Sequence, residues 1–499
     1  MNKFKKILSA GVATLLACVT IGCTTGSGTG NGGNGGNGGD VEIVDGKRVL
    51  NFSFLKAGFG MTPYEELAKA YMEKNPDVLI KLDADPYINT NVDLQINNGT
   101  NVADLYCVRD IDKLRQFVGE GKIMDISALL GSSFEEGYKE AGTTVKSNLS
   151  SQAIEAGTLF GKQWFVPEYT SINGFVYNSS LFEENGWTVP TTTKELEDLC
   201  KQIISETDGE VAPITYCGSA ADGYLYFAVD NWMCTYSGLD NLDEFYEFGS
   251  PEVFAVNSPV TQAKIQAHNN LLKFFKDISE GGYALDGSME IDHHTAQGHI
   301  IDGNAAMMLN GAWFENEMAT VMRDEKYADL ELGMFPLPYI SDENNNKLFA
   351  EGYNTEDGKQ IINADFGAYY FIPTDATNVD DAKDFLKFIN SDEASELYTK
   401  YSNAPRPVNY NLDPEDEYYK DISAFGKSIL KMAHDCYLYA PISSSILGIN
   451  GVVGCYPQGD YYTKKMLLNP AQYGVEKIME SDYDYVSENW EQWVSEWLE

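Results

Sequence analysis

The sequence predicts an α/β protein made of two bodies, because strand and helix patterns alternate along the chain and the alternation recurs in later parts of it. Near the beginning, residues 48–54 alternate in the manner of a strand. Thr62 then has the features of a helix N-cap, with Pro63 at the first helical position and Glu65 three residues after the cap. Residues 78–82 form the next strand pattern. This order predicts a parallel sheet covered by helices on both faces.

The same succession returns after residue 164. Thr192 and Glu195 have the spacing of a capping box, and the residues after them place their apolar side chains on one helical face. Further strand patterns occupy residues 174–178, 213–216 and 368–372, and further helix patterns occupy residues 260–280 and 382–389. A chain of 499 residues is also long enough for two or three domains. We therefore expect two α/β bodies, with a polar loop or hairpin over residues 341–360.

The composition narrows the classes of partner. Hydrophobic residues make up 43% of the chain and charged residues 22%, which is typical of a globular protein. The formal net charge is −40, and such a surface repels nucleic acid phosphates and anionic lipid headgroups. We therefore expect no nucleic acid partner.

The N-terminal segment has the pattern of a secretory signal. A basic start precedes an apolar run over residues 7–19, which is too short for a comfortable membrane span. The run ends in Thr20-Ile21-Gly22-Cys23, which resembles the bacterial lipobox, although Thr20 stands where an aliphatic residue is usual. Cys18 is an alternative lipid site, and a cleaved signal without a lipid is another alternative.

A Gly- and Asn-rich tether follows over residues 24–40. We therefore expect a signal peptide over residues 1–22, and a lipidated Cys23 with a flexible linker over residues 23–44. This places the protein at the extracytoplasmic face of the bacterial cell membrane, attached by its lipid anchor alone.

The cysteines of the body do not indicate a disulfide framework or a zinc site. Six are scattered over a long chain, and no two of them form a CxxC pair. Whether any of them pair is left open. They are Cys107, Cys200, Cys217, Cys234, Cys436 and Cys455.

Several short motifs follow one another in order between residues 45 and 410. They are the run GKQWFVP at 161–167 with Tyr177-Asn178, Leu181-Phe182 and Gly186 after it, Pro190 with residues 192–196, the run GNAAMMLNGAW at 303–313, residues 333–338, and residues 382–393. In this order and spacing, behind a lipobox-like signal, they resemble the solute-binding lipoproteins of bacterial ABC importers for sugars, the family that includes maltose-binding protein. The last 90 residues match this family poorly.

The resemblance implies a two-lobe periplasmic-binding-protein fold, type II-like, with a ligand cleft between the lobes. We expect a first lobe of residues 45–170 plus about 335–395, and a second lobe of about 171–334 plus 396–499. The resemblance also implies hinge closure on a sugar and delivery to the transmembrane subunits of an ABC permease. We expect an oligosaccharide as the ligand, a monomer, and no catalytic residue, cofactor or metal.

Residues 303–313 contain the leading candidate for the ligand site. We expect Gly311 to take the positive φ of a sharp turn. Trp313 comes directly after this turn and matches the stacking tryptophan of the family. Its alternative role is that of a core anchor.

Further candidates follow predicted strands. Arg109 and Asp110 come after the apolar run 103–108, at the carboxyl edge where open α/β sheets bind ligands, and the alternative is an exposed ion pair. Core packing is the alternative for Trp232, and at most one of the adjacent Tyr369 and Tyr370 can face a cleft. The remaining candidates are Glu168, Tyr169, Ser171, Asp230, Trp232, Tyr369 and Arg406.

Rival functions find less support in the sequence. A glycosidase needs two carboxylates at a matched separation, and the chain has too many acidic residues for the sequence to select a pair. His293, His294 and His299 have no catalytic metal spacing, and the loop that starts at Asp342 lacks the glycine and glutamate of a calcium loop. A surface adhesin that binds glycans without a permease is the other alternative.

The stripe Trp490, Trp493 and Trp497 indicates helix packing.

Overall fold

The computed structural model describes residues 41–134, 138–139, 142–219, 223–441, 457–458 and 462–498. The signal sequence, Cys18, Cys23, the tether up to residue 40 and Cys455 lie outside these residues. The described residues belong to one compact unit. In the described part of the chain, no helix combines the length and the apolarity needed to cross a membrane.

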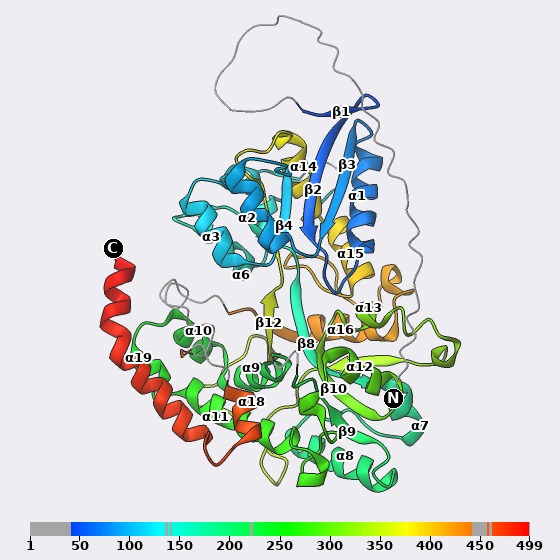
Figure 1. The fold of residues 1–499 in the computed structure, drawn as a ribbon, viewed down its shortest axis with the longest axis vertical. Coiled ribbons are helices and arrows are strands. Elements are labelled where there is room, and N and C mark those ends of the chain that lie inside the picture. The colour runs from blue at the N-terminus through cyan, green and yellow to red at the C-terminus, as the bar shows by residue number, and fades with distance from the viewer. Residues whose placement is uncertain are drawn as a thin grey trace, which may run out of the picture. The chain divides into compact units, whose positions relative to one another are not determined.

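The first lobe is built on a six-stranded sheet (Figure 1). Its strands are β1 (Ile43–Val44), β2 (Lys47–Leu55), β3 (Val78–Asp85), β4 (Leu105–Val108), β7 (Val166–Pro167) and β13 (Tyr369–Phe371). β2 pairs in parallel with β3 and β4, as the sequence predicts, whereas β13 runs antiparallel to β4 and β7. The longer helices of this lobe are α1 (Thr62–Lys74), α2 (Ile88–Asn98), α3 (Ile111–Gly119), α14 (Val379–Ile389) and α15 (Asp392–Ser402), with the shorter α4 (Ser127–Leu130), α5 (Val145–Asn148) and α6 (Ser151–Ala156).

The start of α1 differs from the expectation by one residue. Met61 occupies the N-cap position, Thr62 is already helical, and no side chain caps the helix. Pro63 lacks the N–H that a cap would satisfy in the first turn, so the helix tolerates a start without a capping side chain. Of the capping box predicted in the second lobe, the N-cap Thr192 is confirmed, because its hydroxyl accepts from the backbone N–H of Glu195 at 3.2 Å. The carboxylate of Glu195 accepts from the backbone N–H of Thr191, one residue before the cap, at 2.8 Å.

The second lobe is built on another six-stranded sheet. Its strands are β8 (Thr170–Asn178), β9 (Ala212–Thr215), β10 (Ala305–Gly311), β11 (Leu332–Phe335), β12 (Gln360–Phe366) and β14 (Cys436–Tyr439). Its longer helices are α8 (Thr193–Glu206), α9 (Tyr224–Ser237), α11 (Pro259–Phe274), α12 (His293–Ile301), α16 (Ala424–Asp435) and α19 (Val475–Leu498), with the shorter α7 (Ser179–Asn185), α10 (Leu239–Glu247), α13 (Phe314–Met318) and α18 (Tyr462–Leu468). The two α/β bodies expected from the sequence are thus present.

The chain passes between the two sheets at three places. It leaves the first sheet between β7 and β8, and it returns between β12 and β13. It passes a third time in the segment 403–423, because α15 packs on α1 whereas α16 packs on β11 and β14. The sequence placed the return at about residue 335 and ended the first lobe at about 395. The strand pairing assigns β12 to the second sheet, and the packing of α15 extends the first lobe to residue 402.

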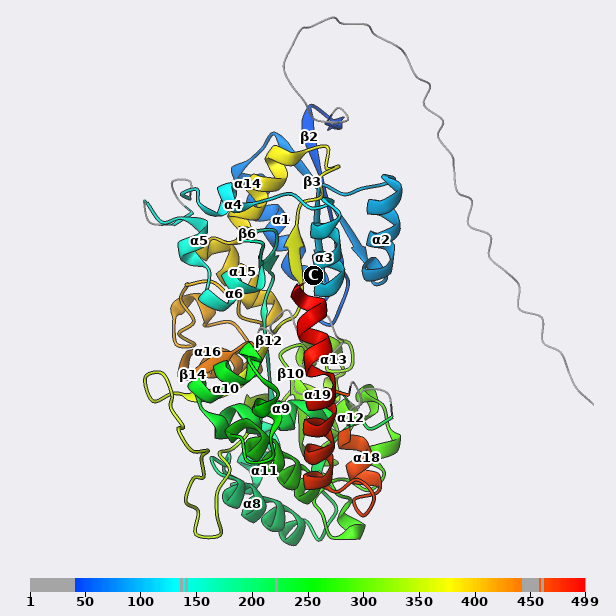
Figure 2. The ribbon, with the colours of Figure 1, turned by 90° about the vertical axis from the view of Figure 1, so that its left-hand side faces the viewer.

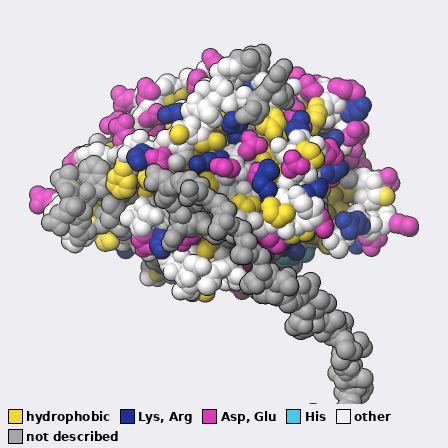
Figure 3. All heavy atoms as spheres, turned by 90° about the horizontal axis from the view of Figure 1, so that it is seen from above, with side chains coloured by type: hydrophobic (Ala, Val, Ile, Leu, Met, Phe, Trp, Pro, Cys, Tyr) yellow, Lys and Arg dark blue, Asp and Glu magenta, His cyan; other side chains and the backbone are white. Residues whose placement is uncertain are grey.

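Most charged side chains lie on the surface of the protein (Figure 3), whereas the cysteines of the described residues lie in its interior. On the face in Figure 3, acidic side chains are spread widely, with lysine and arginine side chains between them. All five cysteines in the described ranges are free and buried. They therefore belong to the core of a protein whose described part contains no disulfide.

The C-terminal helix α19 lies alongside α11 (Figures 1 and 2) and also packs on the short helix η1 (Pro251–Phe254). Trp490 packs edge-on against Phe248 with ring centroids 4.9 Å apart, and Trp493 is buried, so both have the packing role that their spacing predicts. The side chain of Trp497 lies outside the described part. Beneath the helix, Lys264 Nζ and Asp482 Oδ2 are 3.6 Å apart, and neither side chain is more than 2% exposed.

This buried ion pair yields a stability prediction. Asp482→Asn should lower the free energy of unfolding by about 3–5 kcal/mol, because it removes the negative charge that lies 3.6 Å from the buried ammonium group of Lys264. The double variant Lys264→Met/Asp482→Leu should recover most of the loss, since apolar side chains of similar volume need no partner. Urea unfolding followed by circular dichroism measures both. Equal stability of Asp482→Asn and the wild type would contradict the prediction.

Candidate functional site

Arg109 lies where the first sheet meets the crossing segments. It follows β4 directly, its side chain is exposed, and its Nε donates to the carbonyl oxygen of Gly367 at 3.2 Å. Its backbone N–H donates to Asn89 Oδ1 at 3.0 Å, which ties α2 to the end of β4. The guanidinium also donates to the hydroxyl of Tyr169. Arg109 thus links the carboxyl edge of the first sheet to two crossovers: through Tyr169 to the one between β7 and β8, and through Gly367 to the one between β12 and β13.

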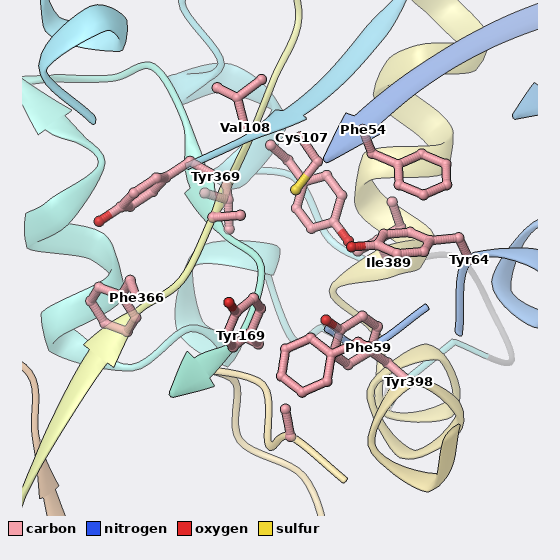
Figure 4. Packing of buried hydrophobic residues seen from close by; sticks show 14 of the residues in the cluster. Phe54, Phe59, Tyr64, Cys107, Val108, Tyr169, Phe366, Tyr369, Ile389 and Tyr398 are labelled. Carbon is pink, nitrogen blue, oxygen red and sulfur yellow. The ribbon is translucent and has the colours of Figure 1, made fainter. Parts of the chain in front are cut away.

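Gly367 allows this close arrangement. A Cβ atom at Gly367 would lie 1.8 Å from Cζ of Tyr169, so no residue with a side chain fits there without moving the tyrosine. Tyr169 is 5% exposed, and burial raises its pKa to about 12. Its ring packs edge-on against Phe59 at 4.8 Å (Figure 4).

Asp365 completes a polar group with Arg109 and Tyr169. It lies on β12 opposite Ser171, and its side chain is accessible to solvent. Burial among neighbouring atoms nevertheless raises the pKa of its carboxyl, while the backbone N–H of Phe366, at 2.7 Å, and the charge of Arg109 oppose the rise. The carboxyl of Asp365 is thus reached by solvent and partly desolvated by its neighbours.

An aromatic shelf formed by Trp313, Tyr224 and Phe227 lies on the second lobe. Trp313 Nε1 donates to the hydroxyl of Tyr224 at 3.0 Å. The Trp313 ring centroid is 6.1 Å from that of Tyr224 and 6.0 Å from that of Phe227, and the Tyr224 and Phe227 rings stack at 5.1 Å. All three side chains are half-buried, so the shelf keeps part of its surface open.

The role of Gly311 differs from the expectation. It lies at the end of β10 and is not among the residues with positive φ. A Cβ atom there would lie 2.3 Å from the indole ring of Trp313, so glycine is needed because the indole folds back over the strand end. The expectation of a positive φ at Gly311 is wrong, and close packing explains the glycine instead.

The aromatic shelf and the polar group are near each other although they belong to different lobes. Burial raises the pKa of Tyr224, and the positive charge of Arg109 acts in the opposite direction, so the two side chains are within electrostatic range. The loop after β2 also reaches the shelf. A Cβ atom at Gly58 would lie 3.0 Å from both Trp313 Cβ and Glu317 Oε1.

This arrangement suits a neutral ligand with flat apolar faces and several hydroxyl groups. Aromatic faces bind apolar faces of a ligand, and the guanidinium, carboxyl and phenol supply directed donors and acceptors. The polar group itself contains one cation, Arg109, and one acid, Asp365. Such a combination of apolar walls and few polar groups is typical of small-molecule sites.

Glu168 and Arg406, two other predicted contacts, lie in the core of the first lobe. Glu168 is 1% exposed and accepts hydrogen bonds from Tyr64, Cys107 and, at 3.0 Å, the hydroxyl of Tyr370. Figure 4 shows Tyr64 and Cys107 close together in this core. Desolvation raises the pKa of Glu168 although these bonds, and the charge of Arg406, oppose the rise.

Arg406 is 2% exposed and is held mainly by backbone and ring contacts. Its guanidinium donates to the carbonyl oxygen of Ile389 at 2.9 Å and to Asn390 Oδ1 at 3.2 Å, and it lies 5.5 Å from the ring centroid of Tyr370. In this conformation neither Glu168 nor Arg406 reaches a surface that a ligand could contact.

The other predicted residues have varied positions. Trp232 is fully buried and donates through Nε1 to Pro338 O at 3.0 Å, so it has the core role that was its alternative. Tyr369 is 5% exposed and packs edge-on against Phe165. Asp110 is exposed and caps α3 by accepting from the Lys113 N–H at 3.0 Å.

Ser171 is 8% exposed on β8, beside Asp365, and Asp230 is half-buried on α9. Of the predicted residues, the structure thus brings Trp313, Arg109, Tyr169 and Ser171 to one region. Among the described residues no group of three or more His, Cys, Asp or Glu side chains could hold a metal ion.

Tyr224, Phe227 and Asp365 were not among the site residues predicted from the sequence. Tyr224 and Phe227 are three apart in the aromatic stretch that begins α9, so a helical periodicity there predicts that both lie on one face. Asp365 interrupts a buried strand, QIINADF, and an acidic residue within such a strand is a signal that its side chain faces solvent.

Comparison with known proteins identifies the family. The profile of the family described as bacterial extracellular solute-binding protein matches residues 60–396. No curated protein is similar enough in sequence to match.

Solved structures have the same fold. RafE from Streptococcus pneumoniae in its apo form has a TM-score of 0.62 at 15% identity, covering 89% of this chain and 100% of that chain, and RafE in complex with raffinose has 0.58 at 16%, covering 88% and 99%. A cyclic α-maltosyl-1,6-maltose binding protein from Arthrobacter globiformis has 0.59 at 17%, covering 89% and 98%. AcbH, a solute receptor with a preference for β-D-galactopyranose, has 0.57 at 15%, covering 89% and 98%.

The buried carboxyl of Glu168 yields a pH prediction. Because its pKa in the folded protein lies above 4.5, the folded state binds more protons than the unfolded state between pH 4.5 and the raised pKa. The stability of the wild type should therefore fall, relative to Glu168→Gln, as the pH rises through this window. Chemical unfolding at a series of pH values measures the difference.

A second variant tests the assignment to Glu168. Tyr370→Phe removes a hydrogen bond that favours the ionised carboxylate, so it should raise the pKa of Glu168 in the folded state and extend the upper limit of this window to higher pH. A stability difference between the wild type and Glu168→Gln that is constant with pH would refute the raised pKa.

Proposed function

Because the chain belongs to the bacterial extracellular solute-binding protein family, we propose that it captures a neutral sugar, an oligosaccharide, between its lobes and delivers it to an ABC permease. The observation that carries this proposal is the aromatic shelf of one lobe beside the polar group of the other. Trp313 supplies the main stacking surface, and Arg109 and Asp365 bind hydroxyl groups.

The chemistry of the two surfaces supports a sugar as the ligand. A pyranose ring has an apolar CH face that covers an aromatic ring, and its hydroxyls accept from a guanidinium and donate to a carboxylate. Neighbouring structures with the same fold bind raffinose, a cyclic maltosyl-maltose and β-D-galactopyranose. These names define the first sugars to test.

Capture and delivery follow from hinge motion. A ligand that contacts both lobes binds the closed arrangement more tightly and shifts the population toward it. The closed form then presents a surface that a membrane partner can distinguish from the open form. The protein performs no reaction on the sugar in this scheme, because its role ends with transfer to the transmembrane subunits.

We further propose that the protein works at the outer face of the membrane, held by a lipid on Cys23. The signal-like start and the Gly- and Asn-rich tether support this placement. A flexible tether of this kind keeps the folded part of the protein near the permease while it binds and releases solutes.

A thermal-shift screen over a panel of glycans tests the choice of ligand. The panel includes raffinose, maltose oligosaccharides and galactose, with charged sugars for comparison. A sugar at 100 times its dissociation constant should stabilise the protein by about 2.7 kcal/mol, because it binds only the folded state. A panel without any stabilising sugar, or release of product from an excess of oligosaccharide, would contradict the proposal.

Trp313→Ala should weaken binding of the best sugar by about 0.5–1.5 kcal/mol or more, because the stacking surface is lost. Isothermal titration calorimetry measures the change. Trp232→Phe is the matched control, since this buried tryptophan belongs to the same lobe and should affect stability without changing affinity. Unchanged affinity in Trp313→Ala would remove Trp313 from the site.

A further inference from the structure

The third crossover, residues 403–423, is fastened at both ends to one carboxylate. Glu315 Oε2 accepts from Asn403 Nδ2 at 2.9 Å and from the Ser423 hydroxyl at 2.7 Å. Asn403 is the C-cap of α15 in the first lobe, and Ser423 is the N-cap of α16 in the second lobe. The segment between them therefore starts and finishes at the same side chain.

The surroundings hold these three side chains in place. Asn403 is 7% exposed and has a φ of 63°, a left-handed conformation that asparagine tolerates better than most residues. A Cβ atom at Gly426 would lie 2.5 Å from Asn403 Oδ1, so the first turn of α16 rests against this side chain. The Ser423 hydroxyl also accepts from the Gly426 N–H at 3.0 Å.

Glu315 belongs to the short helix α13, which directly follows Trp313. A second bond joins this helix to the first lobe, from Asn316 Nδ2 to the carbonyl oxygen of Ser402 at 3.1 Å. Phe314, the first residue of this helix, is buried, and its ring centroid lies 6.2 Å from that of Phe425 on α16. The helix beside the aromatic shelf is thus bonded to the end of one lobe and packed on the other.

We propose that Glu315 is a positioning residue, a clasp that holds the two ends of the third crossover together and so sets the angle between the lobes in the absence of ligand. The inference rests on the proposed function only in taking the lobes to move about the crossovers. Rotation of the lobes changes the distance between Asn403 and Ser423 and strains the two bonds to the shared oxygen. The clasp therefore favours one lobe arrangement, and its loss frees the others.

The chemistry of the clasp allows a matched set of variants. Glu315→Ala removes the acceptor. Glu315→Gln keeps an amide oxygen that can accept from the same two donors, so it is the conservative control. Asn403→Asp keeps the size and the tolerance of positive φ but sets a second carboxylate against Glu315. In Glu315→Gln/Asn403→Asp the glutamine amide donates to the new carboxylate, so the bond is restored in the opposite direction.

The distance between the lobes is the readout, measured without sugar by pulsed electron resonance on the full chain. Spin labels are placed on an unnatural amino acid at positions 69 and 184, because Lys69 on α1 and Glu184 on α7 are both exposed and lie on different lobes. Glu315→Ala and Asn403→Asp should each shift the ratio of the lobe arrangements by on the order of tenfold, equivalent to about 1.4 kcal/mol. Glu315→Gln and the double variant should resemble the wild type.

Wild-type distance distributions in both Glu315→Ala and Asn403→Asp would overturn the proposal, even if both variants melted earlier, because a purely structural role lowers stability alone. Should Glu315→Ala fail to fold, Asn403→Asp and its rescue by the double variant decide the matter. Failure of the double variant to restore the wild-type distribution would also count against the clasp. Because the distance is measured without sugar, the experiment tests the clasp even if the protein binds no sugar, and the two proposals can fail separately.

Discussion

The pairing of β8 with three other strands is the constraint on which the site depends. β8 leaves the first lobe immediately after Tyr169 and pairs with β10, β11 and β12 in the second. Its register sets Asn173 opposite Gly311, and the Ala312 N–H donates to the carbonyl oxygen of Ile172 at 3.1 Å. Trp313 therefore directly follows Ala312, whose backbone N–H is hydrogen-bonded to β8, the strand that crosses between the lobes. The same strand positions Asp365 opposite Ser171, so one element places both the aromatic shelf and the polar group.

Burial and exposure of charge separate the structural acids from the candidate functional acid. Glu168 is enclosed in the first lobe and accepts hydrogen bonds from two phenols and a thiol, so its carboxyl is part of the core next to the first crossover. Asp365 is only a few residues from the second crossover and stays open to solvent. Both carboxyls have a raised pKa with burial as the main cause, but of the two only Asp365 is exposed to solvent. A raised pKa alone would not distinguish them.

Local patterns predicted much of the fold. The apolar alternation of β2, the N-cap Thr192 of α8 and the apolar run before Arg109 are properties of neighbouring residues, and the structure contains all three elements. The lobe boundaries were harder to predict from the sequence, because β12 joins the second sheet by pairing with β8, a strand almost 200 residues earlier in the chain. No local pattern records such a partner.

The candidate site shows the same division. The sequence by itself determined the family, the two α/β bodies and the position of Trp313 in its motif, since these depend on the order and spacing of residues along the chain. Only the tertiary structure decided that Glu168 and Arg406 are enclosed, that Tyr224 and Phe227 join Trp313, and that Glu315 receives both ends of a crossover. The physical reason is that burial and hydrogen-bond partners are set by contacts between segments remote in sequence, which the pattern within either segment does not encode.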